Sequence, residues 1–289
     1  MVAAAVGTPL LVLASLAAVV ALLPGRILGA VALAAVLGSV MAVRARKRLD
    51  RARLLGAGEE PELRAVVERL CVVGDLPRPE IALDDERQPN SWMVDLPGRP
   101  PRLHVTRGLL DVLDGPELEA VVAHELSHLA NRDATVMTVA GWPGAMLLEG
   151  GRSMMRGWWW VAVGAAVAAG IGLLSRAGTN ALSRYRELSA DAGAAALTGR
   201  PSALASALVK VSGTLDRLPA RDLRAVAGRD AFHLMPVEDP RSDRAGRDDR
   251  HPLLRRLGAT HPTLEVRLAA LERLERKMGA ARPGATGLV

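Results

Sequence analysis

Two histidines four residues apart constrain this chain more than any other feature, because they stand in the segment His124-Glu125-Leu126-Ser127-His128. On an α-helix, residues four apart lie on one face, so both imidazoles can reach one metal ion. Glu125 follows the first histidine and is placed to take a proton from water at the metal. This spacing is typical of a catalytic zinc helix, although a solvated amphipathic helix would also fit it.

The residues around this pentapeptide predict a helix with one buried face. Gly115-Pro116-Glu117 indicates a helix start, with proline at the first helical position and a carboxylate in the first turn. Asn131-Arg132-Asp133 supplies a polar end. Apolar residues recur at helical spacing on the face opposite the histidines, at Leu118, Val122, Leu126 and Leu129. A helix buried on one side with histidines on the other is what a rigid zinc site needs.

A third ligand is expected downstream, because a catalytic zinc usually has three protein ligands and one open position for water. Glu187 and Asp191 are the best candidates, since they lie four apart in an alanine-rich helical stretch that ends at Thr198-Gly199-Arg200-Pro201. In this interpretation Glu187 binds zinc and Asp191 accepts the remaining ring N–H of a ligating histidine. Exposed ion pairs with Arg184 and Arg186 are the alternative, and without the upstream motif that alternative would be preferred.

Three motifs follow one another along the chain: His124-Glu125-x-x-His128, Glu187-x-x-Ala190-Asp191 and His261-Pro262-x-x-x-x-Arg267. In their order and approximate spacing, with hydrophobic segments before and between them, the chain resembles the membrane zinc endopeptidases that include the HtpX heat-shock proteases. The CAAX prenyl endopeptidases belong to the same broad group. The resemblance extends from the first hydrophobic segment to about Arg267, which is most of the chain.

This resemblance implies a zinc-dependent endopeptidase with one Zn²⁺ per chain. Glu125 would be the base, and the metal ligands would be His124, His128 and Glu187. His261 and Arg267 would line the site, either as oxyanion donors or as orienters of Asp191. The resemblance also suggests a substrate-lining strand at Asn90, Ser91, Trp92, Met93 and Val94.

Apolar residues are concentrated in a way that predicts membrane spans. The chain is 49% hydrophobic with a mean hydropathy of +0.17, although 24% of its residues are charged. Residues 1–23 and 27–43 contain no charge and flank Pro24-Gly25-Arg26, which indicates a transmembrane hairpin. A signal peptide is the alternative for the first segment, but no basic region precedes it and a second apolar segment follows at once.

Basic residues set the expected orientation. The hairpin turn holds only Arg26, whereas the second span is followed by Arg44, Arg46, Lys47, Arg48, Arg51 and Arg53. The positive-inside rule therefore predicts a multi-pass plasma-membrane protein with its catalytic domain and both termini in the cytoplasm. Trp158-Trp159-Trp160 opens a further apolar run to Leu174 and is interpreted as an anchor at the lipid interface.

The expected architecture is α+β and mainly helical: a zincin-like metalloprotease domain with a small mixed sheet, combined with transmembrane helices. Helices are predicted at 60–73, 202–217 and 261–278, strands at 81–83, 91–94 and 103–105, and a charged loop at 221–250. The predicted parts are a transmembrane hairpin at 1–43, protease segments at 44–135 and 177–279, a hydrophobic membrane hairpin at 136–176 and a disordered tail at 280–289.

Composition also weighs against other function classes. A net charge of +6 and a pI near 10.5 fit a nucleic-acid binder, but aromatics make up only 2% of the chain and stacking platforms are absent. The expected partners are the lipid bilayer and protein or peptide substrates, with misfolded membrane proteins suggested by the family. The alternatives are CAAX-type prenyl-peptide processing and a non-proteolytic scaffold. A structural zinc in such a scaffold would want a fourth ligand, and Cys71, the single cysteine, lies far from both motifs in sequence.

Overall fold

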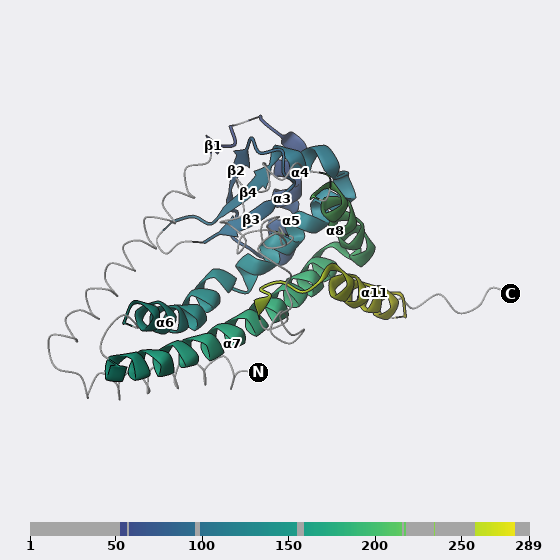
Figure 1. Cartoon of the computed structure of the whole chain (residues 1–289). Helices are drawn as coiled ribbons and strands as arrows, with labels where there is room; N and C mark the ends of the chain where they lie inside the picture. Colours follow the sequence, from purple (N-terminus) through teal and green to yellow (C-terminus); the bar gives the residue numbers. More distant parts are fainter. Residues whose placement is uncertain are drawn as a thin grey trace. The chain divides into compact units, whose positions relative to one another are not determined.

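The computed structural model describes residues 53–56, 58–95, 99–154, 159–215, 217, 234 and 258–280, and this part of the chain is mainly helical with one small sheet (Figure 1). Its elements are β1 (Arg53–Leu54), α3 (Pro61–Gly74), β2 (Glu80–Asp84), β3 (Ser91–Val94), β4 (Arg102–Thr106), α4 (Arg107–Val112), α5 (Gly115–Ala130), α6 (Asp133–Met154), α7 (Trp159–Thr198), α8 (Pro201–Leu215) and α11 (Leu264–Ala280). The expected hairpin at 1–43, nearly all of the charged loop and residues 281–289 lie outside the described residues.

The described chain forms two compact units. One holds the described part of residues 135–183, and the other holds the described residues up to 134 and from 184 onward. Helices α6 and α7 each contribute to both units. Every residue of the candidate site described below belongs to the second unit.

The sheet is mixed, as the sequence predicts, with the strand order β1-β2-β4-β3. β2 and β4 are parallel, and β3 pairs antiparallel with β4 so that Ser91 faces Val105 and Trp92 faces His104. The three predicted strands are confirmed, each within one residue of its expected ends. β1 was not predicted, because two residues are too short to give an alternating pattern.

The two faces of the sheet carry different side chains, since neighbouring residues of a strand point to opposite faces. Leu103 and Val105 face α5 and are fully buried in the hydrophobic core. His104 faces the other way, where its ring stacks on Trp92 with 4.6 Å between centroids and its Nδ1 lies 3.1 Å from Asp84. These contacts with Trp92 and Asp84 are those of a structural histidine.

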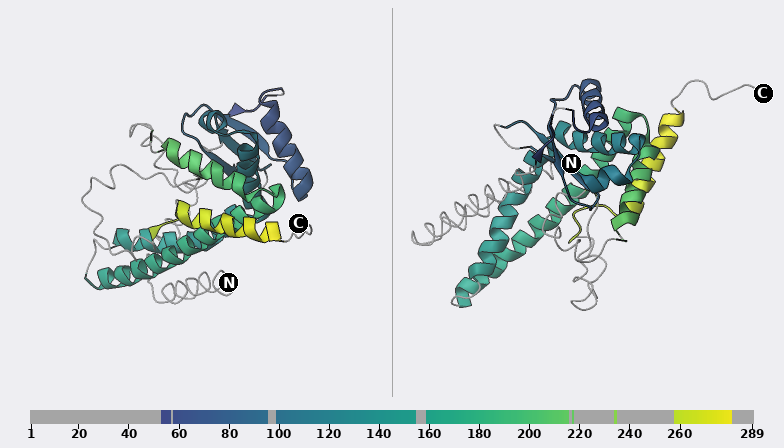
Figure 2. Two further views of the ribbon diagram at one scale, coloured as in Figure 1. Left: turned by 90° about the vertical axis from the view of Figure 1, so that its right-hand side faces the viewer. Right: turned by 90° about the horizontal axis from the view of Figure 1, so that it is seen from above.

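Helix α5 is the central element of the core. Asp114 caps it and forms a capping box with Glu117, which fixes the start that the glycine-proline pair indicates. α3 and α8 pack on α5, and α11 packs on α8. Figure 2 shows this last pair as the green helix (α8) beside the yellow one (α11). The core that these elements share includes Leu63, Val67, Leu70, Val121, Leu126, Leu204, Leu208 and Leu271.

Within the first unit, α6 and α7 run side by side. A Cβ added at Gly144 would lie 2.4 Å from Ser175 Oγ, and one at Gly172 would lie 2.8 Å from the Leu148 amide nitrogen. Glycine at these two positions therefore permits the close approach. α6 continues without a break through residues 141–144 to Met154.

None of the helices in the described part of the chain combines the length and the apolar character that crossing a bilayer requires. The membrane spans therefore stay a prediction.

Candidate metal centre

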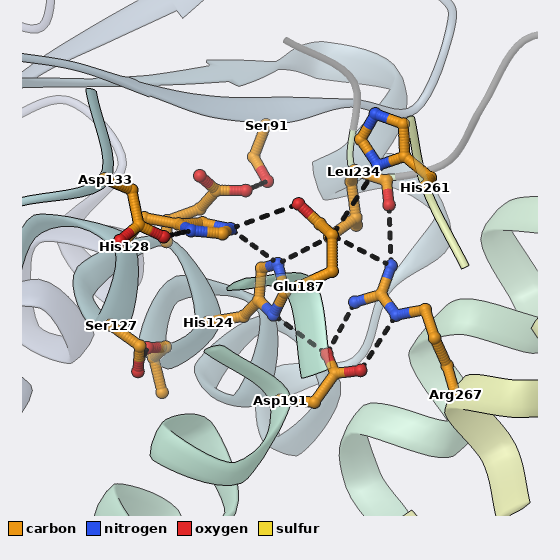
Figure 3. A network of polar contacts seen from close by, with 12 residues as sticks. Ser91, His124, Ser127, His128, Asp133, Glu187, Asp191, Leu234, His261 and Arg267 are labelled. Atoms are coloured by element: carbon orange, nitrogen blue, oxygen red, sulfur yellow. Dashed lines mark hydrogen bonds and ion pairs between the residues drawn. The ribbon is translucent and has the colours of Figure 1, made fainter. Parts of the chain in front are cut away.

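Three side chains from two helices converge on one point (Figure 3). His124 and His128 come from α5, one turn apart, and Glu187 comes from α7. One ligand atom of each lies within 4.8 Å of the others, an arrangement that can hold a metal ion. The Nε2 atoms of the two histidines are 3.1 Å apart, and the Glu187 carboxylate lies 3.6 Å from His128 Nε2 and 3.7 Å from His124 Nε2.

Both histidines turn their other ring nitrogen to a carboxylate. His128 Nδ1 lies 2.6 Å from Asp133 Oδ2, and His124 Nδ1 lies 3.0 Å from Asp191 Oδ1. An ionised carboxylate only accepts hydrogen bonds, so each pairing assigns the ring proton to Nδ1 and leaves the lone pair on Nε2. The two lone pairs therefore point toward each other and toward Glu187.

This donor set fits a zinc ion. Two facing lone pairs and a carboxylate repel one another unless a cation lies between them. In agreement, the buried Glu187 Oε2 has no hydrogen-bond partner among the described residues. Tetrahedral zinc with bonds of about 2.0–2.1 Å separates its ligand atoms by about 3.3 Å. The three separations of 3.1, 3.6 and 3.7 Å bracket that value.

The surroundings of Glu187 favour its ionised form. Burial alone would raise the pKa of this carboxyl, but the net effect places its pKa far below the usual range. The causes that outweigh burial are contact with His261, whose Nδ1 is 3.7 Å away, and the electrostatic effect of His124, Arg267 and His128. An ionised carboxylate is the form that binds a metal.

Asp191 and Arg267 form a buried ion pair behind His124. Asp191 is 0% exposed and Arg267 is 1% exposed. Arg267 Nε donates to Asp191 Oδ2 at 2.9 Å, and Nη2 donates to Oδ1 at 2.6 Å. Burial tends to raise the pKa of Asp191, but the charge of Arg267 and the contact with His124 lower it overall.

Glu125 is buried beside the histidines and accepts a hydrogen bond from a residue of the sheet. Ser91 Oγ, at the start of β3, donates to Glu125 Oε1 at 2.9 Å. The sequence placed both residues at the site but did not link them, since they lie on different elements.

The remaining predicted residues are placed as follows. Arg267 Nη1 donates to the Leu234 carbonyl at 2.8 Å, and Asn90 Oδ1 accepts from the Leu234 amide at 3.0 Å. Of the two roles considered for Arg267, its contacts match the orienting of Asp191. In β3, Ser91 and Met93 point toward α5, whereas Trp92 and Val94 point to the opposite face.

Sequence reasoning missed Asp133 as a partner of His128. It treated Asp133 as part of a polar helix end, and α5 does end at Ala130 with Asn131 as its cap. Arg132 then adopts a left-handed conformation with φ 53°, and Asp133 starts α6. A carboxylate directly after the histidine helix was the available signal.

Comparisons with known proteins agree with this geometry. Residues 57–275 match Peptidase family M48. The chain is 41% identical over 288 residues to "Protease HtpX homolog 1" of Streptomyces coelicolor, covering 94% of this chain and 90% of that protein. It is 39% identical over 248 residues to "Protease HtpX homolog 2" of Methanosarcina acetivorans, covering 78% and 77%. The crystal structure of Ste24p of S. mikatae shares the fold, with a TM-score of 0.56 and 19% identity, over 84% of this chain and 58% of that one.

Proposed function

The chain belongs to peptidase family M48 and is a protease, and from that premise we propose that it is a zinc-dependent endopeptidase of the membrane. The observation that carries the proposal is the convergence of His124, His128 and Glu187, with Glu125 buried beside them. A zinc ion held by these three residues would act as a Lewis acid toward water and toward the scissile carbonyl.

Glu125 moves the proton in this mechanism. Its carboxylate would take a proton from the attacking water and deliver it to the leaving amine. Ser91 fixes one carboxylate oxygen through the 2.9 Å hydrogen bond, so the other oxygen is left for this transfer. The buried pair of Asp191 and Arg267 would hold His124 in the tautomer that presents Nε2 to the metal.

We assign substrate binding to the strand that carries Ser91. β3 lies at the end of the strand order and, among the described strands, pairs with β4 alone. An extended peptide can add to such an edge through main-chain hydrogen bonds, which accept many sequences with little side-chain preference. Asn90, Ser91 and Met93 would face the site side, while Trp92 would serve the sheet by stacking on His104.

The membrane location rests on the sequence and on exposed apolar side chains. The uncharged segments 1–23 and 27–43, followed by a basic cluster, support a multi-pass protein with a cytoplasmic catalytic domain and cytoplasmic termini. Large apolar side chains are also exposed on the described parts of α6 and α7, a feature of lipid contact, at Val139, Val163, Val167, Leu173 and Leu174. Quality control of membrane proteins is the physiological role we propose.

The test is zinc content and casein cleavage by the full-length protein purified in detergent, with and without a chelator. Glu125→Gln should abolish cleavage while it retains about one zinc per chain, because Glu125 transfers a proton and does not bind the metal. His124→Ala should lose both zinc and activity. Full activity of Glu125→Gln, or loss of zinc equal to that of His124→Ala, would overturn the mechanism. A prenylated peptide assayed in parallel tests the CAAX-type alternative.

A further inference from the structure

The side chain of Asp133 reaches back from α6 to the second histidine of α5. Asp133 is only 7% exposed, and its Oδ2 lies 2.6 Å from His128 Nδ1. Arg132, with φ 53°, interrupts the helical path between the two helices and so brings Asp133 to the ring. On a continuous helix, a residue five positions after His128 would point to a different face.

Arg186 holds the other oxygen of the same carboxylate. Its Nη2 pairs with Asp133 Oδ1, and it also donates to the Asn131 carbonyl at 2.9 Å. Arg186 directly precedes Glu187 on α7. It therefore links the candidate ligand Glu187 to the end of α5 at Asn131 and to the Asp133 carboxylate beside His128. Residues 134–183 leave the site after Asp133 and return before Arg186, and this ion pair therefore closes the two ends of that segment.

Each histidine thus has its own chain of partners, a carboxylate backed by an arginine; Figure 3 shows Asp191 with Arg267 beside His124, and Asp133 beside His128. His124 is backed by Asp191 and Arg267, and His128 by Asp133 and Arg186. The first chain is sealed, with side chains 0–1% exposed. The second is more open, since the side chains of His128 and Arg186 are each 17% exposed and that of Asp133 is 10% exposed.

We propose that Asp133 is a positioning residue that fixes the ring orientation and the Nδ1-protonated tautomer of His128, and that Arg186 holds Asp133 in place. A carboxylate on the free nitrogen of a ligating histidine makes the ring a better ligand, and its loss lowers metal affinity. The inference rests on the proposed zinc-dependent function. The competing explanation is structural, because a carboxylate in the first turn of α6 also stabilises that helix through its dipole.

Zinc affinity separates the two explanations, measured on the full-length protein in detergent by competition with a chromophoric chelator. Asp133→Ala should bind zinc about 10–100-fold more weakly than wild type. Asp133→Asn should fall between the two, since its amide oxygen still accepts the ring N–H but carries no charge. Arg186→Gln should also weaken zinc binding, because it frees the carboxylate to turn.

Glu119→Ala is the matched control. Glu119 lies on α5 like the ligands and pairs with Arg69 at 2.9 Å, away from the site. Its removal deletes an ion pair of the same helix, so zinc affinity and cleavage should stay at the wild-type level. Replacing zinc with cobalt(II) adds a direct signature, since the visible bands report ligand geometry and should shift in the Asp133 and Arg186 variants but not in Glu119→Ala.

The outcomes are distinguishable. If wild type binds about one zinc and Asp133→Ala binds it equally well, the positioning role is wrong and the proposed function stands. A lower melting temperature of the metal-free protein with unchanged zinc affinity would establish the structural explanation instead. Should Asp133→Ala fail to fold, Asp133→Asn decides, and an unchanged affinity and cobalt spectrum there would overturn the proposal. A wild-type protein that binds no zinc would overturn both.

Discussion

Removal of the guanidinium of Arg267 tests the electrostatic design of the site. Arg267→Leu leaves the Asp191 carboxylate, which is 0% exposed, without the two hydrogen bonds that the Arg267 guanidinium donates to it. Breaking a buried ion pair by removing one partner costs about 3–5 kcal/mol, because an uncompensated charge stays buried. For a chain of this size that loss lowers the melting temperature by roughly 6–20 °C.

The control for this prediction is the same substitution on the same helix. Arg276 pairs with Glu272 at 2.6 Å, but both side chains are more than half exposed. Such a pair contributes less than about 1 kcal/mol, so Arg276→Leu should melt near wild type. A double variant, Asp191→Leu with Arg267→Leu, should recover much of the stability, since it removes both buried charges.

The pKa of Asp191 determines how the stability difference between wild type and Arg267→Leu should change with pH. Burial tends to raise the pKa of Asp191, but Arg267 and His124 lower it below its ordinary value of 3.8. Its ionised form therefore stabilises the folded protein above about pH 4, and this contribution is lost as the pH falls through the lowered pKa. In Arg267→Leu that pKa rises, so the difference in melting temperature from wild type should be largest at neutral pH and shrink on acidification. Melting of chelator-treated protein between pH 7 and pH 4 measures it. A variant that melts like Arg276→Leu at neutral pH would refute the reasoning.

Three further predictions follow from the geometry. A Cβ at Gly193 would lie 2.5 Å from Ser127 Oγ, so Gly193→Ala should lower the free energy of unfolding by about 1–3 kcal/mol and should weaken zinc binding by pushing α7 away from α5. Adding Ser127→Gly should restore stability in a melting assay and zinc affinity in chelator competition. Glu187→Ala should lose zinc outright in metal analysis, whereas Asp191→Ala should weaken it by about 10–100-fold, and the reverse order would contradict the ligand assignment. A reporter enzyme that works only in the cytosol should be active after the last residue and inactive within the turn at Gly25.

Local patterns in the sequence predicted the parts of the fold that depend on local physics. The histidine helix, the three longer strands and the helix end at Gly199, where φ is 66°, all follow from periodicity, capping and glycine chemistry. The resemblance carried by the three motifs is confirmed by the family match and by the relatives. Glu187 entered as a candidate because Asp191 lies four residues on and because the motif order matched, and the structure brings it to the two histidines.

Contacts between elements could not be predicted in the same way. The hydrogen bond from Ser91 to Glu125 joins a strand to a helix, and no periodicity relates the two residues. The approach of Asp133 to His128 depends on the left-handed φ of Arg132, an arginine in a conformation that side chains rarely adopt. A helical wheel assumes that the helix continues, so it places Asp133 on the wrong face. Such contacts are set by how elements pack and by single turns, which a pattern in one segment does not specify.

The division of the chain into two units has a consequence for the site. Every described polar contact around the three candidate ligands comes from residues up to 134 or from 184 onward, although residues 135–183 lie between the second and third ligands in sequence. The residues of the candidate site named above therefore all belong to one unit. The pair of Asp133 and Arg186 adjoins, in sequence, the points where that segment leaves and returns, and it contacts the candidate ligand His128.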